Sequence, residues 1–131
     1  MTDWTPFPGI SVPPEQAQTI QSEWLARYRR RIEGKHPQIP TWCTFPEDVP
    51  SRNDDGSIWQ NSAFQAHPVV YFYSEYGPPP NLFRATPQQV QDYFERRNPW
   101  EDRDYYIFNP EYTWCIAVTH DDIIIVIGEI A

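Results

Sequence analysis

Residues 104–128, DYYIFNPEYTWCIAVTHDDIIIVIG, contain three apolar runs separated by two turn signals. The first run, 105–108, is aromatic and β-branched, which is typical of a strand. Asn109-Pro110 follows it with the Asn at position i and Pro at position i+1 of a type I turn. From 113 to 119 the residues alternate, so one face of this second strand carries Trp114, Ile116 and Val118.

The third run, Ile123 to Ile127, follows a tight turn at His120-Asp121-Asp122. Its residues are apolar on both faces, which indicates a strand that is covered on both sides. These patterns together predict a three-stranded antiparallel meander at the C-terminal end of the domain.

A further strand and a helix are expected before the meander. Val69 to Ser74 is rich in Val, Tyr and Phe, and the Gly-Pro-Pro-Pro run at 77–80 ends it. Thr86-Pro87-Gln88-Gln89 has the spacing of a capping box, with Thr86 as N-cap and proline at the first helical position. The helix is expected to end before Pro99, because the residue before a proline avoids the helical region.

The first half of the chain predicts one long helix between two proline-rich segments. Ile20, Trp24, Tyr28 and Ile32 recur every four residues, which is the stripe of an amphipathic helix over 14–33. Ser11 is its expected N-cap, and residues 1–13 form a Pro-rich lead. Residues 35–68 are expected to be an extended Pro-rich segment held on the core by aromatic side chains, with a short helix or strand near 58–65.

These expectations combine into one α+β domain over residues 1–131. It has an antiparallel sheet of about four strands, formed by 69–74 and the meander within 69–131. The N-terminal helix and the helix before the meander pack against this sheet.

The composition bears on the partner and the compartment. The net charge of −8 argues against nucleic acid and against an anionic membrane surface, and it suits a basic protein. An acidic composition also serves solubility alone. Cys43 and Cys115 are too few for a disulfide framework, and the N-terminus has no apolar run of a signal peptide. We therefore expect a cytoplasmic protein.

The motifs of common enzymes are missing from the sequence. It has no phosphate-binding glycine loop, no GxSxG, no CxxC and no HExxH. We therefore predict no catalytic residue, no cofactor and no metal. Cys115 is interpreted as a small buried residue, and Thr119 to Asp122 chiefly as a turn. A small enzyme or ligand-binding domain with a pocket near His120 or His67 is kept as an alternative.

The candidate site is a surface for another protein. Carboxylates flank the first meander strand and cap the second hairpin, and only Arg103 offsets their charge there. Exposed Trp and Tyr residues are further candidates, because Trp and Tyr dominate protein-binding hot spots. The candidate partner-binding residues are Glu101, Asp102, Asp104, Glu111, Tyr112, Asp121, Asp122, Trp59, Tyr76 and Trp100.

The pattern of 104–108, Thr113 to Ile116, Thr119-His120 and Ile127-Gly128 resembles small immunity proteins of bacterial contact-delivered toxin systems. There an aromatic strand, a turn, a Trp-bearing strand, a His and a closing Gly follow an earlier aromatic strand, for which Val69 to Ser74 stands here. The resemblance covers residues 69–128. It implies a non-catalytic cytoplasmic protein that blocks one cognate toxin, and it carries no catalytic residues.

Three functions are open from the sequence. The first is an immunity-type inhibitor that occludes the active or substrate-binding surface of a basic toxin domain. The second is the small enzyme or ligand-binding domain. The third is an adaptor or chaperone for a secreted effector.

Overall fold

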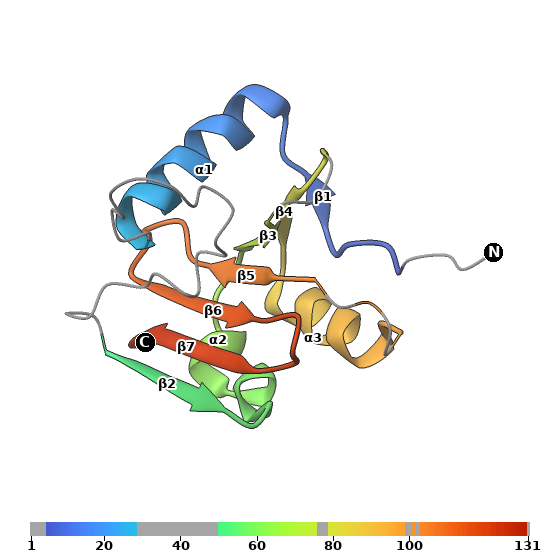
Figure 1. The fold of residues 1–131 in the computed structure, drawn as a ribbon, viewed down its shortest axis with the longest axis vertical. Coiled ribbons are helices and arrows are strands. Elements are labelled where there is room, and N and C mark those ends of the chain that lie inside the picture. The colour runs from blue at the N-terminus through green and yellow to red at the C-terminus, as the bar shows by residue number, and fades with distance from the viewer. Residues whose placement is uncertain (1–4, 29–49, 76–78, 99–100, 102, 131) are drawn as a thin grey trace.

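The computed structural model describes residues 5–28, 50–75, 79–98, 101 and 103–130. Within them, seven strands form one antiparallel sheet in the order β1-β4-β3-β5-β6-β7-β2 (Figure 1). The strands are β1 Ile10–Ser11, β2 Ser51–Asp54, β3 Val70–Ser74, β4 Leu82–Ala85, β5 Tyr105–Phe108, β6 Trp114–Val118 and β7 Ile124–Gly128. The helices are α1 Pro14–Tyr28, α2 Ser62–Gln65, α3 Pro87–Arg96 and the short 3₁₀ helix η2 Ser57–Gln60.

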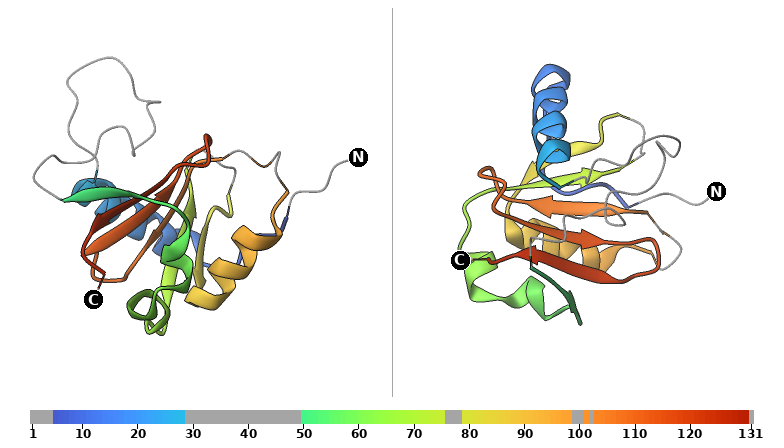
Figure 2. Two further views of the ribbon diagram at one scale, coloured as in Figure 1. Left: turned by 90° about the horizontal axis from the view of Figure 1, so that it is seen from below. Right: turned by 60° about the vertical axis from the view of Figure 1, so that its left-hand side comes forward.

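The sheet lies between two helical layers, with α1 and α3 on opposite sides (Figure 2). On the α3 side, Ile107, Trp114 and Ile116 pack with Val90 and Tyr93. On the α1 side, the alternate strand residues Tyr106, Phe108 and Cys115 pack with Trp24 and Tyr28. Both faces of the central strands are therefore buried, as their apolar sequences require.

The meander is confirmed, with its expected alternation. Tyr105 pairs with Val118 and Phe108 with Cys115, and β6 then pairs with β7 from Trp114↔Gly128 to Val118↔Ile124. Both predicted turns are present, because Tyr112 N donates to Asn109 O at 3.0 Å and Asp122 N donates to Thr119 O at 2.9 Å.

The second predicted helix is confirmed with its cap. Gln89 N donates to Thr86 Oγ1 at 3.2 Å, and Thr86 N donates to Gln89 Oε1 at 2.9 Å. This reciprocal pair satisfies two N–H groups that the first turn leaves without partners. α3 consequently begins at Pro87, where the sequence places it.

The expected number of about four strands is wrong, because β1, β2 and β4 extend the sheet. β4 is a four-residue strand, and β1 has only two residues. β2, with the sequence SRND, has an exposed polar surface and no β-forming pattern. It is a strand because its backbone pairs with β7, from Ser51↔Ile127 to Asp54↔Ile124. Pairing of this kind leaves little trace in side-chain periodicity.

Two expectations for the first half also change. Ser11 is not the N-cap of α1 but part of β1, where it pairs with Phe83. The helix begins at Pro14, and Ala17 N donates to Pro13 O at 2.9 Å. In the described part of 35–68, the short helix expected near 58–65 is present as η2 and α2, whereas Ser51–Asp54 is the strand β2 rather than an extended segment outside the sheet. Residues 29–49 lie outside the described part of the chain.

Candidate functional site

The predicted partner-binding residues divide between the two ends of β5. Asp104 precedes the strand and lies beside the β6–β7 turn, which carries Asp121 and Asp122. Glu111 and Tyr112 lie in the β5–β6 turn at the opposite end. The predicted residues therefore do not form one acidic rim. Asp102, Tyr76 and Trp100 lie outside the described residues.

The β6–β7 turn is held by a buried threonine. Thr119 N donates to Ile123 O at 2.9 Å, which closes the hairpin. Its Oγ1 accepts hydrogen bonds from Asp121 N at 3.3 Å and Ile123 N at 3.2 Å. Asp122 takes a positive φ of 61°, which Asp tolerates better than most residues. The turn is therefore fixed from inside, without a glycine.

Asp104 binds the turn from the neighbouring strand. Its Oδ1 lies 3.0 Å from both the backbone nitrogen and Nδ1 of His120. On its other side, His120 Nε2 lies 3.7 Å from Asp121 Oδ2. The imidazole thus lies between two carboxylates, and His120 is a structural part of the turn in this arrangement.

Arg97, at the end of α3, reduces the negative charge at this end of the sheet. Its Nη2 lies 2.6 Å from Asp122 Oδ1, and its guanidinium carbon lies 5.5 Å from the Tyr105 ring centroid. The sequence count of charges near the meander did not include Arg97, because it precedes the meander. The sequence signal for Arg97 is its position at the C-terminal end of a capped helix.

We define the acidic turn surface as Asp104, His120, Asp121, Asp122 and Ile123. The side chains of Asp121 and Asp122 are 65% and 69% exposed, and Ile123 is 42% exposed. Two exposed carboxylates thus precede an exposed aliphatic side chain on a rigid turn.

Glu101 and Trp59 are buried in this structure and offer little surface to a partner. Glu101 is 1% exposed, and its carboxylate accepts hydrogen bonds from the backbone N–H groups of Thr5 and Asn98. Burial alone would raise the pKa of Glu101, but these hydrogen bonds hold it below its ordinary value. Trp59 stacks on Phe94 with the ring centroids 4.8 Å apart.

The local hydrogen bond of Glu101 to the Asn98 backbone had a sequence signal that our interpretation missed. Its Oε2 reaches back to Asn98 N at 2.8 Å, while Glu101 N donates to Asn98 O at 3.0 Å. A carboxylate three residues after an Asn is the spacing at which a side chain closes a local turn onto the backbone.

Tyr112 joins the β5–β6 turn to α1. Its ring stacks on Phe108 with the centroids 5.9 Å apart, and its backbone oxygen accepts a hydrogen bond from Tyr28 Oη at 3.0 Å. Burial raises the pKa of the Tyr112 hydroxyl, and a hydrogen bond to Glu23 raises it further. Glu111 is exposed in the same turn.

The two histidines of the alternative site lie apart. The His67 ring packs edge-on against Trp114 at 5.1 Å, at the start of β6, whereas His120 follows the end of that strand. Cys115 is fully buried, and this burial raises the pKa of its thiol. In the described ranges, no three His, Cys, Asp or Glu side chains group as metal ligands.

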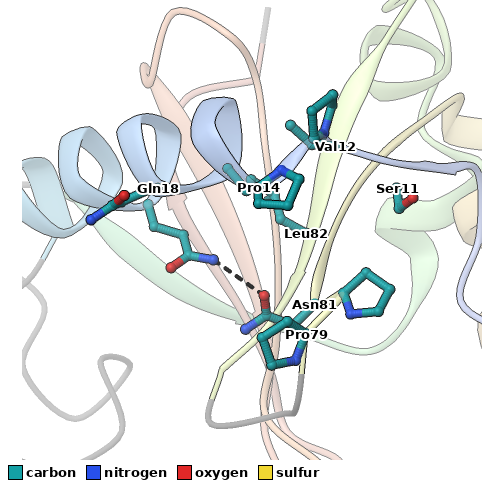
Figure 3. A pocket seen from close by; sticks show the side chains of 11 residues that line it. Ser11, Val12, Pro14, Gln18, Pro79, Asn81 and Leu82 are labelled. Atoms are coloured by element: carbon teal, nitrogen blue, oxygen red, sulfur yellow. Dashed lines mark hydrogen bonds between the residues drawn. The ribbon is translucent and has the colours of Figure 1, made fainter.

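A cavity of about 630 Å³, which the sequence did not indicate, lies between the start of α1 and the segment that leads into β4 (Figure 3). Pro13 and Pro14 line it from one side and Pro79 and Pro80 from the other. Its walls include neither His67 nor His120.

No family model, no curated protein and no solved structure matches the chain.

Within the described part of the chain, no helix is both long and apolar enough for a transmembrane span.

Proposed function

We propose that this chain is a non-catalytic inhibitor of the immunity type, which binds a cognate bacterial toxin domain in the cytoplasm and occludes its active or substrate-binding surface. The observation that carries the proposal is the acidic turn surface. A binding turn that is already rigid loses little conformational entropy when a partner docks. The Thr119 and Asp104 hydrogen bonds supply that rigidity.

The chemistry of this surface favours a basic partner. Asp121 and Asp122 are exposed beside the apolar contact that Ile123 offers, although Asp122 is also paired with Arg97. The net charge of −8 has the same sign as this surface, and complementary fields accelerate association. A toxin domain with a basic substrate-binding surface is the partner that fits both features.

The direct test is to co-express the tagged chain with the product of the adjacent gene in the source genome. The proposal expects co-purification and loss of that product's toxicity. Binding without loss of toxicity would instead identify an adaptor or chaperone. Absence of both binding and protection would refute the proposal.

A charge-reversal pair tests the location of the contact. Asp121→Lys should slow association severalfold at low salt and flatten its dependence on ionic strength. Glu111→Lys makes the same charge change at the opposite end of β5 and serves as the matched control. Equal effects of the two variants would show that the acidic turn surface has no special role.

A further inference from the structure

The cavity beside α1 has walls without charge. Among the described residues that line it, none is Asp, Glu, Lys, Arg or His, although 21% of the residues of the chain are charged. A charged group placed against such walls would lose hydration without gaining a counterion. The cavity therefore selects a neutral ligand, unlike the acidic turn surface.

The cavity is preformed by backbone pairing and a side-chain lock. Val12 N donates to Leu82 O at 2.9 Å and so joins the two sides of the cavity. Gln21 Nε2, on α1, donates to Asn81 Oδ1 at 3.2 Å, so a side-chain bond also joins the two sides; it is the dashed line that ends at Asn81 in Figure 3. The volume of the cavity lies in the range of about 300–1,000 Å³ that is typical of ligand sites.

Proline rings are the main apolar contact that the cavity offers. Pro13, Pro14, Pro79 and Pro80 present rigid C–H surfaces whose ordering costs almost no side-chain entropy. The face of an aromatic ring carries negative charge density, which complements such C–H groups, and proline–aromatic packing is a recurrent mode of peptide recognition. An aromatic side chain is the group that these walls fit best.

The same walls carry neutral hydrogen-bonding groups. The side-chain amides of Gln18, Gln21 and Asn81 each contain a donor and an acceptor. The Asn81 amide is already engaged by Gln21 and by Ser74 O, so the Gln18 amide and the Gln21 oxygen are the groups that the cavity offers to a ligand. Such amides can accept the indole N–H of Trp or bond the hydroxyl of Tyr, neither of which brings a charge. Trp and Tyr are also the residues that most often anchor protein interfaces.

The cavity and the acidic turn surface are connected through the sheet. Ser74 N donates to Asn81 O at 2.9 Å, and the next residue, Glu75, donates through its N–H to Asp104 O at 3.1 Å. Asp104 in turn holds His120. From β4 to β6 there are three interstrand spacings, on the order of 15 Å, so one partner of ordinary interface size can contact both.

We propose that the cavity receives a Trp or Tyr side chain of the protein that docks on the acidic turn surface. The role of the cavity in that interface rests on the proposed function. The selectivity of the cavity for a neutral aromatic group in a peptide is independent of it. The acidic turn would then steer the partner, and the aromatic anchor would hold it.

The selectivity is tested with capped tripeptides and the isotopically labelled full chain. Acetyl-Gly-Trp-Gly-amide should shift the side-chain amide signals of Gln18, Gln21 and Asn81 and bind at least about fivefold more tightly than the Leu peptide. Absence of shifts at millimolar peptide, or equal binding of the Leu peptide, overturns the proposal. Equal binding of 3-methylindole alone would identify a site for free aromatic molecules and overturn the assignment to a peptide.

A variant that fills the cavity tests whether the peptide binds there. Ala17→Leu places a larger side chain of good helix propensity at the cavity wall and should weaken Trp-peptide binding more than tenfold. Ser22→Leu, at an exposed position of α1 away from the cavity, is the matched control. Thermal unfolding of both variants verifies the fold, and unchanged peptide binding by a folded Ala17→Leu variant overturns the proposal.

The two proposals fail separately. If the Trp peptide binds but no toxin is inhibited, the immunity function is wrong and the cavity's selectivity stands. If a toxin is inhibited with the same affinity by the parent and by Ala17→Leu, the immunity function stands and the aromatic anchor is wrong.

Discussion

The Tyr28 hydroxyl donates a hydrogen bond to the backbone oxygen of Tyr112 at 3.0 Å. This contact joins the last described turn of α1 to the β5–β6 turn, 84 residues away in sequence. Tyr28 is fully buried, and its ring packs on Trp24 with the centroids 6.1 Å apart. α1 is thus fixed to the sheet by a polar bond as well as by aromatic packing.

Tyr28→Phe should lower the free energy of unfolding by about 1 kcal/mol, because the ring packing stays and the carbonyl of Tyr112 loses its donor. Urea denaturation measures the change. Tyr71→Phe is the matched control, since the half-buried Tyr71 hydroxyl makes no hydrogen bond to any described residue. Equal stability losses in the two variants would contradict the proposed role of the Tyr28 bond.

Asp54 should make stability depend on pH in the acid range. Burial alone would raise its pKa, but hydrogen bonds from Arg52, Ile58 N and Gly56 N lower it below the ordinary value. A carboxylate with a lowered folded pKa stabilises the protein above its unfolded pKa, near 4, and loses this effect as pH falls through the folded value.

Asp54→Asn should therefore cost about 2 kcal/mol at pH 7 and progressively less as the pH falls below about 4. The measurement is urea unfolding of the parent and the variant between pH 7 and pH 3. A difference in stability that stays constant over this range would rule out ionisation of Asp54 as the cause.

Thr86→Ala removes the side chain that caps α3 and should destabilise the protein by about 1 kcal/mol. Thr19→Ala, at an exposed position inside α1, should be neutral or slightly stabilising because alanine has the higher helix propensity. Thermal unfolding compares the two variants. A similar loss in both would mean that the Thr86 hydroxyl contributes nothing as a cap.

Gly128 and Gly56 both adopt positive φ, at 79° and 102°, but their surroundings differ. A Cβ on Gly128 would lie 2.5 Å from Thr113 O, whereas a Cβ on Gly56 would meet nothing within 4 Å. Gly56→Ala should therefore cost about 1 kcal/mol from backbone strain, and Gly128→Ala at least twice as much. Comparable midpoints of chemical unfolding for the two variants would contradict the steric argument.

The elements that could be predicted from the sequence are those whose own side chains reflect their burial or their capping. β5 and β6 are apolar because both of their faces are buried, β7 is apolar and at least partly buried along its length, and α3 carries its capping box in four consecutive residues. β2 could not be predicted, because the sequence SRND is held by the backbone of β7. Its strand state depends on a partner rather than on its own residues.

The candidate site could be predicted in part for the same reason. The turn at Asp121 and Asp122 is local, and its proximity to Asp104 follows from the hairpin. The ion pair from Arg97 depends on how α3 packs, and the proline-walled cavity depends on two segments that meet only in the fold. Neither has a pattern within one stretch of sequence.

The strand order has a consequence for how the chain is made. β1 and β2 form the two margins of the sheet, yet both leave the ribosome before the strands they border. β2 has no place until β7 has been synthesised, because Ser51 pairs with Ile127. A nascent chain that stops short of β7 would leave β6 and β2 without their neighbour, so we expect this sheet to assemble late, after its C-terminal strand has emerged.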